Sequence, residues 1–316
     1  MDRKVKAATL SVASNSVLVA SKVAVGIVTG SVSILSEAAN SALDVFASVI
    51  AFLSVRVSGQ PADREHPYGH GKMENLSGAV EAVLILATGV FIVHEAMDKL
   101  RYPADVKHVF WGLCVMGFSF VADVVVSRHL FRVARETDSI ALEADAYHLS
   151  TDVWTSMGVF VGLALIKLTG WQIIDPIVAM IVAVMIMKVA FSLTWKAARP
   201  LLDVRLPDNE LKELEEMVMG TPKIVGYHKL RTRKSGPYRE IDVHLIVPER
   251  MPVREAHQIA ENLEDKMREA FPHTHVVTHI EPDTAEVTNE PDTEIRRHPP
   301  QRKTRQFPKR RRKPPR

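Results

Sequence analysis

Two pairs of residues that commonly bind metals lie four positions apart inside apolar stretches: Asn40 with Asp44, and His148 with Asp152. Residues i and i+4 share one face of an α-helix, so each pair would point both side chains the same way. An ionisable group at membrane depth is costly unless it faces a partner, water or an ion. Nitrogen and oxygen donors without cysteine suit zinc, iron, cobalt or manganese better than calcium or magnesium. The pairs therefore predict a divalent-metal site, with hydrogen-bonded contact between helices as the alternative.

Further acidic residues lie close to these pairs or in other apolar stretches. Glu37 precedes Asn40 by three residues, and Asp145 precedes His148 by three, so both could extend the same helix faces. We expect them to support or gate the site rather than to bind the metal, because charged groups near span ends often reach water. Two more apolar stretches also contain an acid, Glu81 in one and Asp123 in the other.

A second concentration of ligands follows in a polar loop. Asp63, His66 and His70 lie at short spacing, and Gly69 and Gly71 permit a tight backbone there. Such a loop could fold three ligands around one ion, although a lone loop histidine is usually only solvated. The loop is thus a candidate for a second metal site.

Six apolar windows approach the length of about 20 residues that crosses a bilayer. An even number of spans places both termini on one side, and the Lys/Arg excess of the flanking segments predicts that this side is the cytoplasm. The basic loop 99–107 weakens this asymmetry without reversing it. We expect a multi-pass inner-membrane protein without a cleavable signal. The windows are residues 8–29, 33–55, 76–98, 108–127, 146–167 and 174–194.

From about residue 200 the pattern becomes that of a soluble domain. Apolar residues at helical spacing follow Asp208, and residues 253–270 form a second amphipathic pattern. Strands are predicted over residues 223–233, 239–247 and 276–280. The order α-β-β-α-β predicts an α+β domain with both helices on one face of a small sheet.

Four histidines and one acid of this soluble half are further metal-ligand candidates. Each histidine alone is more often a surface residue, but together they could gather where two copies of the domain pair. His273 and His275 are weaker candidates. The main set is His228, His244, His257, His279 and Glu281.

The C-terminal segment 285–316 is predicted to be a disordered basic tail. Residues 296–316 contain eleven Lys/Arg and no acid, and without them the net charge of +3 would be −8. Such a run cannot bury enough apolar surface to order itself. Anionic lipid could attract it, and so could nucleic acid, but a solvated tail without a specific partner is the simpler interpretation.

Several signals of other functions are absent from the sequence. His94-Glu95 begins like a zinc-peptidase helix, but Asp98 stands where the second histidine is required. The segment Gly69-His-Gly-Lys72 lacks the spacing of a phosphate-binding loop. Cys114 is the only cysteine, which excludes an internal disulfide and a cysteine-rich zinc site. We therefore do not expect an enzyme or an ATP-driven pump.

Over residues 1 to about 284 the chain resembles the cation diffusion facilitators, divalent metal/proton antiporters. The similarity is closest to their bacterial ferrous-iron and zinc efflux branch. Its motifs are Ser31-Val-Ser-Ile-Leu with Asn40 and Asp44, His66-Pro-Tyr-Gly-His70-Gly-Lys72, Asp145-Ala-Tyr-His148-Leu-Ser-Thr-Asp152 and His228-Lys-Leu-Arg-Thr-Arg-Lys-Ser-Gly-Pro237.

The resemblance implies a six-helix membrane domain over residues 1–200 and a metallochaperone-like cytoplasmic domain over residues 201–284, working as a homodimer. It also assigns roles to the candidate residues. The transport site would be Asn40, Asp44, His148 and Asp152, and the loop site Asp63, His66 and His70. The cytoplasmic sites would use His228, His244, His257, His279 and Glu281, and an ion pair of Lys72 with Asp203 would link the two halves.

The sequence departs from the family pattern at two places. Asn40 occupies a position that is commonly Asp or His, which removes a charge or an imidazole from the transport site. Glu281 stands where the closest branch has Asp, and Ile280 replaces a polar neighbour. We expect these changes to affect metal selectivity and the strength of the cytoplasmic site.

The predicted function is efflux of zinc(II) or iron(II), with cobalt, nickel or manganese as further substrates, in exchange for protons. The metal would also act as a regulator. The alternative is a membrane-anchored metal sensor that does not transport, although such a protein would not need ligands at membrane depth. An intramembrane metal-dependent hydrolase would need an open coordination position and a general base, and neither is identifiable.

Overall fold

The computed structural model describes residues 2–29, 32–101, 109–171, 173–284 and 295–297. The chain divides into two compact units. The first consists of residues 1–205 together with 233–239, and the second consists of residues 206–232 together with 240–316.

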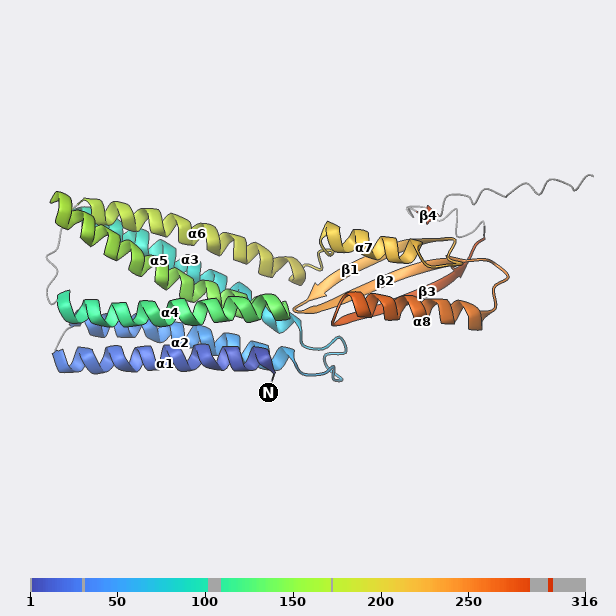
Figure 1. Ribbon diagram of the computed structural model, residues 1–316, viewed down its shortest axis with the longest axis horizontal. Coiled ribbons are helices and arrows are strands. Elements are labelled where there is room, and N and C mark those ends of the chain that lie inside the picture. Colours follow the sequence, from blue (N-terminus) through green and yellow to red (C-terminus); the bar gives the residue numbers. More distant parts are fainter. Residues whose placement is uncertain (1, 30–31, 102–108, 172, 285–294, 298–316) are drawn as a thin grey trace, which may run out of the picture. The chain divides into compact units, whose positions relative to one another are not determined.

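The first unit is a bundle of long helices that run side by side (Figure 1). Helix α3 packs on α6, α1 on α2, and α4 on α5. Small residues allow close approach: a Cβ atom at Gly158 would lie 2.9 Å from the Val182 side chain. The helices are α1 (Arg3–Thr29), α2 (Val32–Ser58), α3 (Lys72–Arg101), α4 (Val109–Thr137), α5 (Ile140–Thr169) and α6 (Ile174–Leu201).

Four of these helices contain described segments that are long and apolar enough to cross a membrane. They are Arg3–Val28, Ser41–Ser58, Lys72–Asp98 and Pro176–Leu201. The expectation of a helical membrane domain is confirmed, while membrane crossing by α4 and α5 stays a prediction.

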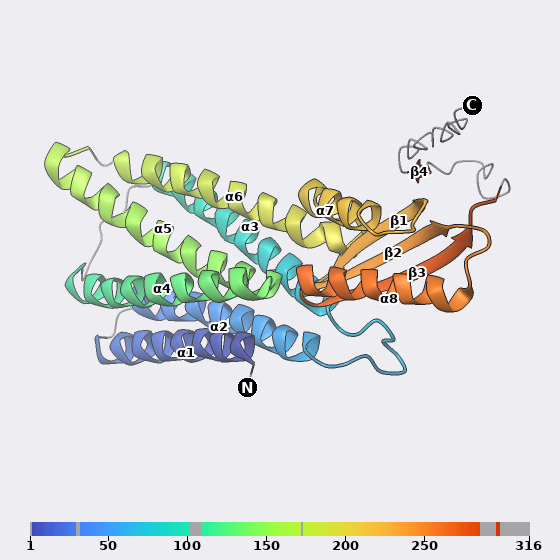
Figure 2. The ribbon, with the colours of Figure 1, turned by 45° about the vertical axis from the view of Figure 1, so that its right-hand side comes forward.

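A buried polar cluster joins several helices at one end of the bundle, the end where α3 and α5 begin (Figure 2). Lys4 Nζ of α1 lies 2.8 Å from Glu74 Oε1 of α3, and both side chains are buried. Ser58 donates to Glu74 Oε1 at 2.7 Å, and Ser139 donates to Oε2 at 2.5 Å. Glu74 therefore has a cation and two hydroxyl donors as partners, which lowers the cost of burying its charge.

The hairpin tip 233–239 packs in the first unit through polar contacts. Gly236, at φ +58°, donates its backbone N–H to Asn75 Oδ1 at 2.7 Å. Lys234 Nζ lies 2.5 Å from Asp138 Oδ2, and Arg239 lies 3.3 Å from the same oxygen.

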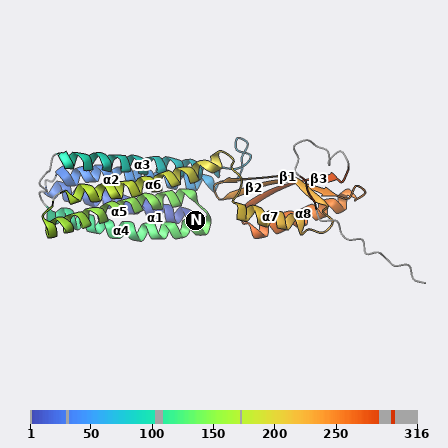
Figure 3. The same cartoon turned by 90° about the horizontal axis from the view of Figure 1, so that it is seen from above.

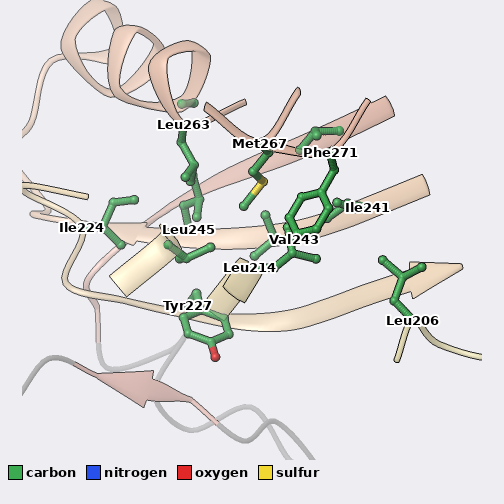
Figure 4. Close-up of a cluster of buried hydrophobic side chains, with 13 residues drawn as sticks. Leu206, Leu214, Ile224, Tyr227, Ile241, Val243, Leu245, Leu263, Met267 and Phe271 are labelled. Atoms are coloured by element: carbon green, nitrogen blue, oxygen red, sulfur yellow. The ribbon is translucent and has the colours of Figure 1, made fainter. Parts of the chain in front are cut away.

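The second unit contains the elements in the order that the sequence predicts: α7 (Asp208–Met219), β1 (Gly226–Ser235), β2 (Tyr238–Val247), α8 (Val253–Ala270) and β3 (Thr274–Pro282). The sheet order is β3-β2-β1-β4. The alternating apolar residues of β2 are buried, and α7 and α8 cover the same face of the sheet (Figure 3). Leu214 of α7 and Leu263 of α8 meet Ile241, Val243 and Leu245 in one core (Figure 4).

Within the predicted tail, the structure describes residues 295–297. Arg296–Arg297 form the short strand β4, which pairs antiparallel with Gly226 and Tyr227 of β1. The edge of β1 offers backbone partners, and Arg297 also forms an ion pair with Asp283 at 3.1 Å. The rest of the predicted tail, apart from Ile295, lies outside the described residues.

Candidate metal centres

The central site lies between α2 and α5 in the first unit. Asp44, His148 and Asp152 each offer a ligand atom, and these atoms all lie within 4.8 Å of one another. His148 Nε2 is 3.0 Å from Asp44 Oδ1, and the histidine side chain is only 6% exposed. The four-residue spacing on α5 places His148 and Asp152 on one face toward Asp44. One imidazole and two carboxylates are an ordinary ligand set for a first-row divalent metal.

The fourth predicted member of this site, Asn40, lies one helical turn before Asp44 in α2. Its side chain lies outside the described part of the structure, as does that of Glu37. Their roles stay predictions.

Polar side chains of α1 and α4 surround the central site. Lys22 is buried and donates from Nζ to Ser41 Oγ at 2.6 Å. Asp123 of α4 is also buried, and both residues lie near enough to Asp152 to act on its charge. Sequence reasoning missed Lys22, although a lysine in the middle of the first apolar window was a signal that could have found it.

Asp145 does not reach water, contrary to the expectation for a charged group near a span end. It is 1% exposed, and among the described residues neither carboxylate oxygen has a partner at ordinary hydrogen-bond distance. Glu81 of α3 is fully buried as well, and its Oε2 also has no such partner in the described part of the chain. Packing of α5 against α1 and α3 explains the burial.

The loop after α2 brings its three predicted ligands together. Asp63 Oδ1 lies 3.2 Å from His66 Nδ1, and Asp63 Oδ2 lies 3.3 Å from His70 Nε2. Gly69 makes the required turn at φ +76°. Hydrogen bonding from the backbone N–H of His66 is the main cause that lowers the pKa of Asp63. The acid is thus ready to bind a cation, and the donor set fits a divalent metal.

Lys72 and Asp203 form an ion pair, with Nζ 2.9 Å from Oδ1. The hydrogen bond from Lys72 lowers the pKa of Asp203, and Arg233 adds to the effect from 3.6 Å. All three residues belong to the first unit. Asp203 lies two residues after the end of α6, so the pair joins this segment to the start of α3. That the pair links the membrane half to the cytoplasmic half stays a prediction.

In the second unit, two histidines converge on one acid. His228 Nε2 lies 2.7 Å from Glu281 Oε2, and His244 Nδ1 lies 2.6 Å from Oε1. Burial raises the pKa of Glu281, but hydrogen bonds with His244 and His228 outweigh it, so that the net shift is downward. Buried His228 Nδ1 has no hydrogen-bond partner among the residues that the structure describes. These residues fit a metal ion, which would displace the protons shared between them.

The other predicted ligands of this domain are placed less centrally. His279 packs against His244 with ring centroids 4.7 Å apart, and its Nε2 is 3.6 Å from Glu281. His257 does not join His228, His244 and Glu281. It lies on α8 beside Glu261, and its side chain is 67% exposed. His275 lies 3.3 Å from Glu240.

The chain is similar to known cation-efflux proteins over most of its length. Residues 8–202 match the cation efflux transmembrane domain, and residues 206–283 match the cytoplasmic domain of cation efflux proteins. The cation-efflux pump FieF of Pectobacterium atrosepticum is 35% identical over 83% of this chain and 87% of its own length. FieF of Citrobacter koseri is 35% identical over 80% and 84%. The uncharacterized transporter sll1263 of Synechocystis is 33% identical over 81% and 83%.

Together the two matches cover most of the chain, with the membrane domain first and the cytoplasmic domain second. The motifs seen in the sequence lie within these matched segments. The chain therefore belongs to the cation diffusion facilitator family of cation-efflux transporters.

Proposed function

We propose that the protein exports a divalent transition metal, zinc(II) or iron(II) first among them, from the cytoplasm in exchange for protons. The observation that supports this most is the convergence of Asp44, His148 and Asp152 inside an apolar helical unit. A sensor anchored by its helices would have no use for such a cluster at membrane depth. Asn40 would complete the site as a neutral oxygen ligand.

The contact between His148 and Asp44 provides the exchange step. Their 3.0 Å separation is that of a hydrogen bond, and in this proposal His148 is protonated on both ring nitrogens in the metal-free state and donates from Nε2 to Asp44. Metal ligands must be deprotonated, so an arriving cation displaces the proton on Nε2. When the site opens to the other side, a returning proton on His148 weakens the ligand set and releases the metal. Histidine is the side chain whose charge changes nearest to physiological pH.

The rest of the proposal concerns topology and assembly. Helices α1–α6 would all span the inner membrane, with both termini in the cytoplasm, and two copies would form a homodimer. The loop cluster of Asp63, His66 and His70 would hold a further metal ion, and so would the cluster around Glu281, where they would regulate transport. His257 would reach a metal only where two cytoplasmic domains pair. Membrane lipid is the surrounding partner, and no specific nucleic acid is proposed.

Vesicles containing the purified protein test this function. We expect zinc uptake to follow an imposed pH gradient, and Asp152→Ala to abolish uptake because it removes one ligand. Glu143→Gln on the same helix is the matched control. Glu143 Oε2 lies 2.6 Å from Lys196 Nζ, and Glu143 is not one of the proposed ligands. Uptake that ignores the gradient, or that survives Asp152→Ala, would contradict proton antiport at this site.

A further inference from the structure

Three buried polar side chains come from three helices of the bundle. Ser11 of α1, Glu81 of α3 and Asp145 of α5 are at most 1% exposed, and each has at least one polar atom without a partner at ordinary hydrogen-bond distance among the described residues. Glu81 and Asp145 are near enough to repel each other electrostatically, and Ser11 and His148 act on the charge of Asp145. We propose that Glu81 and Asp145 form a proton-binding site, separate from the metal ligands, that couples proton movement to metal transport. The inference rests on the antiport function proposed above.

The register of α3 and α5 places the two acids at the same depth. The hydrogen bond between Ser139 and Glu74 joins the start of α5 to the start of α3. One turn after Glu74, a Cβ atom at Gly78 would lie 3.2 Å from the Ile140 side chain, so the two helices also pack closely there. Glu81 follows Glu74 by seven residues, which corresponds to about 10 Å of helix rise. Asp145 follows Ser139 by six residues, or about 9 Å.

Polar groups continue from this pair in both directions along the helices. Toward the end of the bundle, Ser77 donates to Glu81 Oε1 at 3.3 Å, and Glu74 lies three residues before Ser77. Toward the middle, His148 follows Asp145 by three residues and so lies on the same face of α5. The pair therefore lies between the bundle end and the metal ligands, in a row of polar side chains that passes through an apolar interior.

A second acid of α3 shows what a purely structural buried carboxylate looks like in this bundle. Glu74 is as buried as Glu81, yet it has Lys4 at 2.8 Å and two serine hydroxyls on its oxygens. Among the described residues, Glu81 has only Ser77 as a hydrogen-bond donor, on one oxygen, and the acid Asp145 acts on its charge. His148 acts on the charge of Asp145, but no cation is paired with Glu81 among the described residues, and two buried carboxylates that repel each other cannot both keep their charge at low cost. The pair must hold a proton.

A proton fits this pair better than the transported metal does. The pair offers carboxylate oxygens and one hydroxyl but no imidazole, whereas the imidazole ligand His148 lies one helical turn away among two more acids. Transition metals favour the site that contains nitrogen.

The charged surroundings explain how the pair responds to metal. On the other helices packed against the pair, Asp44 of α2 and Lys4 of α1 already have partners, His148 and Glu74. On α6, Lys188 is exposed and Lys196 pairs with Glu143. Lys22 of α1 and Asp123 of α4 are buried near Asp152, so their charges lie on the metal side of the pair. A divalent cation at the metal ligands adds further positive charge near Asp145. The carboxyl O–H bond then breaks and its proton leaves to water, while a proton that returns favours metal release.

The test measures zinc and proton fluxes together in vesicles, with a metal-sensitive dye and a pH-sensitive dye. We expect Glu81→Gln and Asp145→Asn to retain zinc binding at alkaline pH but to release about one proton fewer per zinc ion. Glu81→Asp, which keeps a carboxyl group, is expected to restore the ratio. Glu143→Gln is the control and should behave as the wild type.

The possible results separate this inference from the function on which it rests. Zinc flux without any proton flux in the wild type would contradict antiport itself. Proton coupling in the wild type that stays unchanged in both variants would overturn only the acid pair. Loss of zinc binding at alkaline pH in folded variants would show that the two acids help to bind the metal. That result would also overturn the proposal of a separate proton-binding site. If Glu81→Gln or Asp145→Asn fails to fold, the number of protons that Glu81→Asp releases on binding zinc is measured by calorimetry instead. We expect the wild-type number, and a different number would overturn the proposal.

Discussion

At the scale of single residues, the proposed transport site would set which ion the protein holds. The ligand set around His148 combines one nitrogen with carboxylates, and Lys22 places a buried positive charge nearby, with its Nζ 2.6 Å from Ser41. Such a set discriminates metals through the number and charge of its ligands. Asn40, the uncharged member predicted from the sequence, is the position at which that charge is most easily changed.

Replacing Asn40 with aspartate tests this point. We expect Asn40→Asp to shift the preference between zinc and iron(II) by roughly 10-fold or more, because it adds a full charge to the ligand set. Competition between the two metals in vesicle flux measures the shift. Unchanged selectivity would show that Asn40 does not take part in metal choice.

Glu281 should have the strongest effect in the cytoplasmic domain, because it contacts both His228 and His244. We expect Glu281→Gln to weaken zinc binding there by roughly 10-fold or more. Titration in an Asp152→Ala background isolates this site from the transport site. Zinc affinity equal to that of the parent would exclude Glu281 as a ligand.

The same acid gives a pH dependence whose sign follows from its lowered pKa. A group whose pKa is lower in the folded state stabilises the fold above its ordinary pKa of 4.5, and the contribution disappears as the pH falls through the folded value. Metal-free wild type should therefore lose protection of the β2 amides against hydrogen exchange as the pH drops below 4.5. Glu281→Gln should lose less of this protection over the same pH range below 4.5. A loss equal to that of the wild type would contradict the assignment of this pH dependence to Glu281.

At the scale of helices and strands, periodicity carried most of the prediction. Apolar residues alternate in β2 and recur about every 3.6 residues in α8. A strand buries the first pattern on one face and a helix buries the second, and both elements formed as expected. What the sequence could not show is contact between distant residues. The join of Lys4 to Glu74 spans 70 positions, and the burial of Asp145 depends on how α1 and α3 pack against α5.

The buried pair of Lys4 and Glu74 should hold the helix ends together far more strongly than the exposed pair of Lys72 and Asp203. Removing one partner of a buried pair costs about 3–5 kcal/mol, whereas an exposed pair contributes about 0–1 kcal/mol. We expect Lys4→Met to lower the thermal stability in detergent markedly, and Lys72→Met to change it little. Similar melting temperatures for the two variants would contradict this ranking.

At the scale of the whole molecule, the site was predictable where ligands follow one another along a helix or a loop. The i, i+4 pair on α5 and the short loop around His70 needed no tertiary information, and the structure brings both together. His257 shows the opposite case. The structure does not gather it with His228, His244 and Glu281, so a role as a ligand would need a second copy, which a single sequence cannot place.

The central claim is that this transporter moves metal through Asp44, His148 and Asp152. The most direct measurement is zinc flux into vesicles containing the wild type or Asp44→Ala, together with zinc binding at the cytoplasmic domain of the same samples. We predict that Asp44→Ala lowers flux by roughly 100-fold and leaves cytoplasmic binding intact. Undiminished flux in Asp44→Ala, or no flux in a folded wild type that still binds zinc, would contradict the claim.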